Sequence, residues 1–570
     1  MNFSPNERIA GVLTPLFAIR TEDDLGIGDL EGLRQFIDWA RGIGFKLVQL
    51  LPINETGGDN SPYNAISSRA IDPTTLFLAP GSPEDLSQRI YDEVVGKVDL
   101  KSLRRGRVKY QVVKPLKKKL LERAFAAFRR RSQKAPARCE AFASFCEAEK
   151  SWLDDYALFR TLMEQDGERE KWDEWPNDHR SIMAARAWLD SLGKRERRVV
   201  EGRRQFFSYV QWIAHEQWRE IKAYAESRGV ALMGDIPFGV SYYSADVFTQ
   251  PEQFALDWSG GAPPESYFKD DEFTQKWGQN WGIPLYRWDA MRSGNFDWWR
   301  RRVRGVKEIF HIFRIDHVLG FYRIYSFPWR PEKNDEFLPL SWEEMRAKTG
   351  GKEPRFVPRD DSTWENCAAN SHEGETYLRM VLEESGATRV VGEDLGVVPA
   401  YVRPSLRSLG IAGFKIPQWE NYPDNRSIPG REYERLSVTA FATHDHKPLR
   451  ALWEEVLEKT DNSVQARHDL AKIAELSGIV SPNEPTDFAR DFYPAVFEAL
   501  FQSESWIAIV MITDLLARKE RFNVPGTAAH SNWTGRIHRP VRSLAVSREL
   551  KRQLDIVREL LARSGRTSPS

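Results

Sequence analysis

A charged cluster interrupts an apolar run between His311 and Trp329. The stretch reads HIFRIDHVLGFYRIYSFPW, and it places Arg314, Asp316 and His317 within four residues at the end of an apolar strand pattern. Removing a carboxylate or a guanidinium from water costs several kcal/mol unless the charge is well paired. Such a cluster at the end of a strand therefore indicates a site for chemistry.

Three further apolar runs end in acidic residues in the same way. Asp235 closes ALMGD, Glu393 and Asp394 close VVGED, and Asp445 closes FATHD. A single acid in such a place could equally be a helix N-cap, because Asp is a favoured capping residue. Four such positions in succession, two of them with Arg or His alongside, favour a shared function instead.

Eight apolar runs provide the strands that would position these acids. Helical patterns lie between several of them, and Gly229 ends the helix before GVALMGD. Strands that alternate with helices indicate a parallel sheet, and about eight of them predict an α/β fold of the TIM (β/α)8 barrel type. All strands of such a barrel end at one face, so the acids should meet there. The runs are GVLTPLFAI, GFKLVQLLPINETG, GVALMGDIPFGV, IFRIDHVLG, TRVVGEDLGVV, AGFKIPQWE, SVTAFATHDH and SWIAIVMITDLL.

The chain has 570 residues, far more than a minimal barrel needs, which predicts large and mainly helical insertions. Lys and Arg greatly outnumber Asp and Glu between 97 and 138. The segment VVKPLKKKLLERAFAAFRRR is amphipathic, however, so a solvated helix face explains its charge better than nucleic-acid binding. We expect a catalytic barrel over 1–540, a helical insertion over 81–203, a loop insertion over the active-site face at 244–290, and a C-terminal helix with a polar tail over 541–570.

The composition argues against several classes of protein. Lys plus Arg and Asp plus Glu both number 82, so no net charge attracts the chain to nucleic acid or to an anionic membrane. No apolar stretch reaches the ~18 residues of a membrane helix, and the first residues lack the pattern of a signal peptide. Three cysteines make a disulfide framework unexpected and favour a cytoplasmic protein. The oligomeric state is not predicted.

Several carboxylates facing aromatic rings suit either metal binding or cleavage of a glycosidic bond. Cleavage needs one protonated carboxyl that feeds the leaving oxygen and one ionised carboxylate that attacks or stabilises the sugar carbon. Arg314 and Asp316 share a strand face, and a cation favours the charged form of its neighbour, so Asp316 suits the nucleophile. Glu393 has an acidic neighbour and no adjacent cation, and it suits the proton donor. Asp445, beside His444, would be a third acid that holds sugar hydroxyls.

The motifs FRIDHVLGF, VVGEDLG and ATHD, in this order, resemble those of the amylomaltases, the 4-α-glucanotransferases of the α-amylase clan. So do LTPLFAIRTEDDLGIGDLEGL, SPYNAISSRAIDP, GDIPFGV, GQNWGIPLYRWDAM and NVPGTAAHSNWTGRI. The resemblance implies a retaining double displacement that passes a segment of an α-1,4-glucan to the 4-hydroxyl of another glucose or glucan. It implies maltooligosaccharides and α-1,4-glucans as substrates, and we expect no cofactor and no metal.

The resemblance assigns roles residue by residue. It implies that Asp316 is the nucleophile, that Glu393 is the general acid/base and that Asp445 stabilises the transition state. For Asp235 a structural role and direct contact both stay open. The remaining positions are implied to bind substrate or support the acids: Asp235 at a strand end, Arg314 beside the nucleophile, His317 and His444 at sugar hydroxyls, Tyr63 stacked under the transferred sugar, and Trp281 over the acceptor side.

The chain departs from the pattern of the family at two places. Many amylomaltases continue the third acid motif as THDN, whereas this chain reads THDHKPL, with His446 and Lys447. The PPD that is common in the mobile loop is here PPE, ending at Glu265. The three acids are intact, and the departures bear on acceptor preference and product length.

Three alternatives stay open from the sequence. An α-1,4-glucan hydrolase would use the same acids, with water in place of the sugar acceptor. A metal-dependent barrel enzyme could use the acids together with His317, His444 and His446 as ligands. A non-catalytic glucan-binding scaffold is the third alternative, and the full set of acids argues against it.

Overall fold

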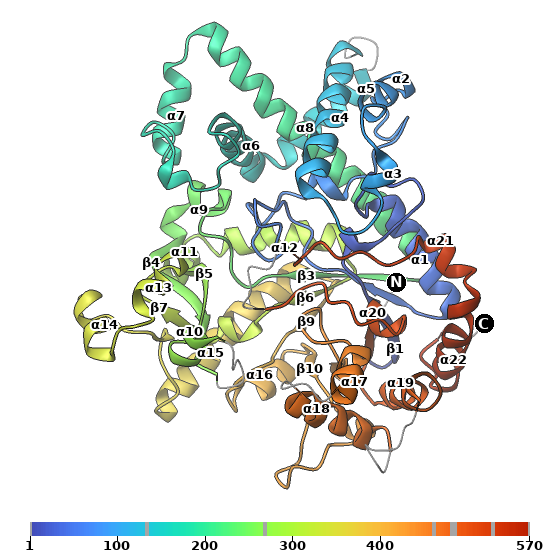
Figure 1. The fold of residues 1–570 in the computed structure, drawn as a ribbon. Helices are drawn as coiled ribbons and strands as arrows, with labels where there is room; N and C mark the ends of the chain where they lie inside the picture. Colours follow the sequence, from blue (N-terminus) through green and yellow to red (C-terminus); the bar gives the residue numbers. More distant parts are fainter. Residues whose placement is uncertain are drawn as a thin grey trace.

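The structure, a computed structural model, describes residues 3–131, 136–265, 271–458, 463–478, 487–525 and 531–567. Its centre is an eight-stranded parallel sheet that curls into a barrel (Figure 1). Each of the eight predicted runs contributes to this sheet, so the predicted TIM barrel is confirmed. The strands follow one another in chain order: β1 (Ile9–Leu13), β2 (Leu47–Gln49), β3 (Ala231–Ile236), β6 (Ile312–Ile315), β9 (Arg389–Gly392), β10 (Gly413–Lys415), β11 (Ser437–Thr439) and β12 (Ile507–Met511).

The barrel closes between β9 and β10. β12 pairs with β1 in parallel over five residues, and the ladder continues through β2, β3 and β6 to β9. At the last seam a single bridge joins Val391 to Ala412, and the Gly392 N–H donates to the Ala412 carbonyl at 2.9 Å. Because all eight strands are parallel, their carboxyl ends open onto one face.

Barrel strands are covered on both sides, which is why they read as continuous apolar runs. β12 (IAIVM) is buried along its whole length, and so is β3 (ALMGDI). One residue of β3 is out of place in such a run, because Asp235 brings a carboxylate into a fully buried strand. The partners of Asp235 lie at the active-site face.

The helices of the barrel layer and its appendages surround the strands (Figure 1). They are α1 (Leu30–Ile43), α9 (Ala245–Thr249), α10 (Glu272–Lys276), α11 (Trp288–Ser293), α12 (Asp297–Ile309), α13 (Asn334–Phe337), α14 (Trp342–Lys348), α15 (Trp364–Ser385), α16 (Val402–Ser408), α17 (Leu449–Glu458), α18 (Ser463–Leu476), α19 (Tyr493–Gln502), α20 (Ile512–Leu515), α21 (Val541–Ala545) and α22 (Arg548–Arg563). Among the described residues, none of the helices combines the length and the apolar character needed to cross a bilayer.

The region between β2 and β3 forms a helical body above the barrel in the view of Figure 1. The described part of 81–203 contains helices and no strand. Its last helix continues to Ser227, so the expected boundary at 203 falls inside one continuous helix that leads directly into β3. The basic run lies on the third helix of the series, where Lys119 and Arg130 are exposed while Leu116 and Leu120 are buried. The helices are α2 (Gln88–Val95), α3 (Leu100–Leu103), α4 (Tyr110–Arg131), α5 (Pro136–Ala148), α6 (Lys150–Gln165), α7 (Ile182–Ser191) and α8 (Lys194–Ser227).

A second sheet lies beside the barrel and is antiparallel, in the order β5-β4-β7-β8. Its strands are β4 (Phe254–Ala262), β5 (Gln279–Tyr286), β7 (Ile324–Phe327) and β8 (Arg355–Val357). The stretch 244–290, expected to be a loop, thus contains two strands, while its residues 266–270 lie outside the described ones. Glycine, proline and shifts of register between β4 and β5 obscure their alternating pattern in the sequence.

The C-terminal segment is anchored to the barrel beyond α22. Arg566 is fully buried, and its guanidinium donates to the carbonyl oxygens of Phe501 at 2.6 Å, Ile9 at 2.8 Å and Ser503 at 2.7 Å. These bonds tie the end of the chain to the start of β1. Residues 568–570 of the predicted polar tail lie outside the described residues.

Candidate active site

The carboxyl ends of the barrel strands open into a cleft of about 560 Å³. The structure brings nearly all of the predicted site residues into its walls, and Asp235 lies buried behind them. The lining residues from the predicted set are Tyr63, Trp281, Arg314, Asp316, His317, Glu393, His444 and Asp445.

Asp316 directly follows the last residue of β6, and its backbone N–H donates to the Ile236 carbonyl of β3 at 2.9 Å. The next residue, His317, adopts a left-handed conformation with φ 49° and ψ 56°. This conformation is costly for a bulky side chain and is concentrated at functional sites. It turns the chain sharply, so that the His317 N–H donates to Oε2 of Glu393 at 2.7 Å.

Arg314 holds two carboxylates at once. Its Nη1 lies 2.6 Å from Oδ2 of Asp235, and its Nη2 lies 2.6 Å from Oδ1 of Asp316. Burial opposes the charge of this guanidinium, but Asp235 and Asp316 together hold the pKa of Arg314 well above its usual value. A planar guanidinium presents its donors in a fixed fork, so it sets the direction of both carboxylates.

Asp235 supports the site from behind. It is only 4% exposed, and Oδ2 accepts hydrogen bonds from Tyr63 Oη at 2.7 Å and from Arg314. Burial raises the pKa of Asp235, and the charge of Arg314 opposes this rise. Of the two roles left open by the sequence, this geometry favours the structural one.

Glu393 directly follows β9 and is buried. Its Oε1 accepts from the Leu395 N–H at 2.9 Å, and its Oε2 accepts from His317. Burial raises the pKa of Glu393 to about 7; Arg314 opposes the rise and Asp316 adds to it. This carboxyl can therefore carry a proton near neutral pH, as a general acid must.

The acidic neighbour of Glu393 contributes in a different way from the one expected. Asp394 turns away from the cleft, where it accepts from the Phe414 N–H at 2.6 Å and from Nε of Arg403 at 3.0 Å. The raised pKa of Glu393 comes from burial, and the carboxylate that adds to it is Asp316. The carboxylate that raises the pKa of Glu393 is thus Asp316, which is distant in sequence, and not the adjacent Asp394.

A shared contact with Arg314 limits how far apart the two acids can lie. Oδ1 of Asp316 and Oε2 of Glu393 lie 2.6 and 3.9 Å from the same atom, Nη2 of Arg314. These two oxygens therefore cannot be farther apart than the sum of the two distances. Retaining glycosidases hold their carboxyls about 5–5.5 Å apart and inverting ones about 6.5–9.5 Å apart, so a separation within this limit is compatible with retention.

Asp445 lies in the loop after β11 and not at the strand end, because β11 ends at Thr439. Its Oδ2 lies 3.1 Å from Nε2 of His444, and its Oδ1 accepts from Nδ2 of Asn523 at 2.6 Å. Burial alone would raise the pKa of Asp445, but His444 and Asn523 hold it well below its usual range. Asn523 was missed as a site residue, although it begins the motif NVPGTAAHSNWTGRI.

Aromatic rings form the walls on either side of the acids. The Tyr63 ring stacks on His444 at 5.0 Å, and Trp533 lies 5.9 Å from both rings. Trp281, from β5, meets the ring of His317 edge-on at 4.8 Å. Trp533 is a second missed residue, and it lies in the same motif as Asn523.

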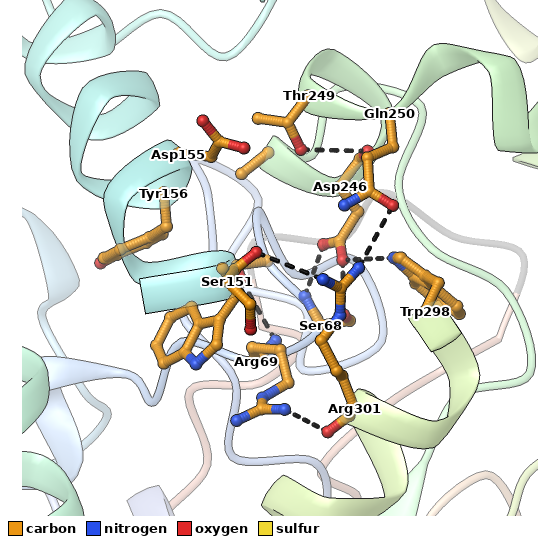
Figure 2. A pocket seen from close by; sticks show the side chains of 13 residues that line it. Ser68, Arg69, Ser151, Asp155, Tyr156, Asp246, Thr249, Gln250, Trp298 and Arg301 are labelled. Atoms are coloured by element: carbon orange, nitrogen blue, oxygen red, sulfur yellow. Dashed lines mark hydrogen bonds between the residues drawn. The ribbon is translucent and has the colours of Figure 1, made fainter. Parts of the chain in front are cut away.

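The loop that carries Tyr63 is fixed at its far end. Figure 2 shows a small hollow where this loop meets α6, α9 and α12. Its volume is about 30 Å³, room for about one water molecule. Asp246 accepts from the Ser68 N–H at 2.7 Å, from the Ser68 hydroxyl at 2.6 Å and from Nε1 of Trp298 at 3.1 Å. The residues around the hollow therefore anchor the loop, and the hollow itself is too small for a sugar.

Two histidines of the cleft, His444 and His446, have a protein partner on a ring nitrogen. Nε2 of His444 faces Asp445, and Nδ1 of His446 faces Thr443. Within the described ranges, no three His, Cys, Asp or Glu side chains come together as a set that could hold a metal ion.

A parallel barrel with paired acids at its carboxyl face, lined by aromatic rings, is an architecture suited to an enzyme that acts on glycosidic bonds. The family model described as 4-alpha-glucanotransferase matches residues 14–542. The chain belongs to this family.

The relatives agree with this assignment. A 4-alpha-glucanotransferase of Chlamydia pneumoniae is 30% identical and covers 95% of this chain and 93% of its own. The solved amylomaltase of Corynebacterium glutamicum has a TM-score of 0.77 at 20% identity, over 97% of this chain and 75% of that one. The amylomaltase of Streptococcus agalactiae in complex with acarbose has a TM-score of 0.73 at 22% identity, over 99% of this chain and all of that one, so both structures support the fold. The predicted 4-α-glucanotransferase is confirmed, and nothing in the comparisons favours the hydrolase.

Proposed function

We propose that Asp316, Glu393 and Asp445 carry out a double displacement on α-1,4-glucans. In the first step the Asp316 carboxylate attacks the anomeric carbon, while Glu393 gives its proton to the glycosidic oxygen. The bond between sugars breaks, the leaving segment departs with a free 4-hydroxyl, and the donor segment stays as an ester on Asp316.

The second step reverses the roles of the two acids. Glu393, now a carboxylate, takes the proton from the 4-hydroxyl of an incoming sugar, whose oxygen attacks the same carbon. The ester to Asp316 breaks, and the new bond has the configuration of the old one. With a proton donor whose pKa is about 7, both directions of transfer are accessible near neutral pH.

One observation carries this proposal. The same nitrogen of Arg314 is within 4 Å of both acids, and only Asp316 is close enough for a direct ion pair, at 2.6 Å against 3.9 Å. The cation therefore pairs closely with Asp316, while the carboxylate oxygens of Glu393 accept from two backbone N–H groups, and such unequal surroundings are what two different roles require.

The other residues act on the sugar. Asp445, with its pKa held low by His444 and Asn523, supplies a carboxylate that can hold hydroxyls and offset positive charge at the anomeric carbon. Burial lowers the pKa of His317 to about 4, so at neutral pH its ring is an uncharged hydrogen-bonding group. Tyr63 is proposed to stack under the transferred sugar and Trp281 to contact the acceptor.

Maltooligosaccharides and longer α-1,4-glucans are the proposed substrates, and the cytoplasm is the proposed location. The aromatic walls of the cleft support the first, and the scarcity of cysteine supports the second. Fractionation of the source cells with detection of the protein would test the location.

Incubation with maltotriose alone, with and without EDTA, tests the function. We expect glucose together with maltopentaose and longer chains, at constant total reducing ends, in both samples. Glucose and maltose with rising reducing ends would mean hydrolysis. Loss of activity with EDTA and its return with added metal would favour the metal-dependent alternative.

A further inference from the structure

One wall of the cleft carries two residues that the mechanism does not use. His446 lies one position beyond Asp445 in the loop after β11, and Trp419 lies in the loop after β10. Both line the cleft that contains the acids, and their ring centroids are 5.1 Å apart. Trp419 is 44% exposed, so a large part of its side chain is accessible in this cleft.

The protein fixes the hydrogen-bonding state of His446. The backbone N–H of Thr443 donates to its Nδ1 at 3.1 Å, so Nδ1 must be an acceptor. Burial lowers the pKa of His446 to about 4, so the ring is neutral near pH 7 and its one proton lies on Nε2. Nε2 has no hydrogen-bond partner among the described residues, and it is not among their fully buried polar atoms.

Lys447 is the other residue at which this chain departs from the THDN pattern, and its charge does not face the cleft. Its Nζ lies 2.9 Å from both carboxylate oxygens of Glu455 on α17. The change from THDN to THDHKPL therefore presents one new feature to a sugar. That feature is a neutral N–H donor set beside an open tryptophan ring.

We propose that His446 and Trp419 form a glucosyl subsite that sets the preference of this enzyme for glucan length. The apolar face of one glucose ring would rest on Trp419, and Nε2 of His446 would donate to one of its hydroxyls. An aromatic face combined with a donor at its rim is the standard means of holding a flat hydroxylated ring. The inference rests on the proposed function, because it assumes that glucans occupy this cleft.

Binding to a catalytically silent enzyme tests the subsite without turnover. In an Asp316→Asn background, titration calorimetry with maltoheptaose should show binding weakened roughly five-fold by His446→Ala and roughly ten-fold by Trp419→Ala, as expected for one neutral hydrogen bond and one stacking surface. Trp364→Ala is the matched control, because Trp364 is 78% exposed on α15 and does not line the cleft. Unchanged affinity in variants that melt at the temperature of the parent would overturn the proposal.

Turnover by the active enzyme provides a second test of the subsite. With maltotriose to maltoheptaose as sole substrates, His446→Ala and Trp419→Ala should flatten the rise of kcat/KM with length, and His446→Asn should change the lengths of the products. Equal losses at every length would also overturn the subsite. If the parent binds maltoheptaose but transfers nothing, the proposed function fails while the binding arm still decides the subsite.

Discussion

Nη2 of Arg314 lies 2.6 Å from Oδ1 of Asp316, two residues further along the same chain. The two side chains leave the same face of the chain, as residues two apart on a strand do. Since the other end of the guanidinium is fixed by Asp235, the direction of the proposed nucleophile is set from behind, by groups that need not touch the sugar.

Replacing Arg314 by Lys keeps the positive charge but removes the planar fork of donors, so it tests whether the geometry of the guanidinium matters. An ammonium cannot hold Asp235 and Asp316 in a fixed fork, so we expect kcat to fall roughly 100-fold. The protein should also lose on the order of 3 kcal/mol of stability, because a buried carboxylate loses its best partner. Steady-state kinetics and denaturant melts measure both effects.

Arg304→Lys is the matched control for this change. Arg304 is 47% exposed, pairs with Glu384 at 3.0 Å, and does not line the cleft. We expect it to change neither kcat nor stability by a measurable amount. A kcat for Arg314→Lys within two-fold of the parent would contradict the positioning role.

The rate of the first step should fall as the pH rises above about 7. Glu393 must be protonated to act as the acid, and burial raises its pKa to about 7. In the alkaline limb kcat/KM should therefore drop about ten-fold per pH unit. The measurement is the pH profile of kcat/KM for a maltooligosaccharide donor between pH 5 and 9, and a flat profile up to pH 9 would remove Glu393 from the role.

The buried Glu393 carboxyl should lower the stability of the folded protein at high pH. A carboxyl whose pKa is raised on folding binds more protons in the folded state. Its contribution to the free energy of unfolding is therefore fully present below the pKa of the unfolded chain and is lost as the pH rises through the pKa of the folded protein. Above pH 8 the ionised Glu393 should lower the free energy of unfolding by on the order of 3 kcal/mol, relative to low pH. Glu393→Gln should therefore raise Tm relative to the parent at pH 8 and change it little near pH 4.5. Equal shifts at both pH values would show that ionisation is not the cause.

Removal of the Asp246 carboxylate should loosen the loop that carries Tyr63. Asp246→Ala deprives three donors on Ser68 and Trp298 of their acceptor, so we expect a loss of about 2 kcal/mol. KM for maltotriose should rise because Tyr63 is no longer held against His444. Asp190→Ala is the control, since both partners of its ion pair with Arg197 are exposed. An unchanged KM would mean that the loop is held by other contacts.

The sequence predicted the barrel and the acids because both leave local signals. Buried parallel strands read as apolar runs, and a charged residue at the end of such a run is conspicuous. The strands β4 and β5 left no such signal, since glycines and bulges break their alternation.

The supporting residues could not be read from the sequence, because their contacts join distant segments. Asn523 meets Asp445 from 78 positions away, and Asp394 beside Glu393 points elsewhere, to Phe414 and Arg403. The His446 ring contacts the N–H and the hydroxyl of Thr443, only three residues earlier, but the path of the loop that allows this is not visible in the sequence.

Trapping the covalent intermediate tests the central claim most directly. Glu393→Gln should be incubated with maltosyl fluoride, whose leaving group needs no acid, so that the first step proceeds while the second lacks its base. After quenching and digestion, mass spectrometry should find a maltosyl group on the peptide that contains Asp316, and no label when Asp316→Asn is added. A label on Asp445 or Asp235, or fluoride release with no labelled peptide, would contradict the account.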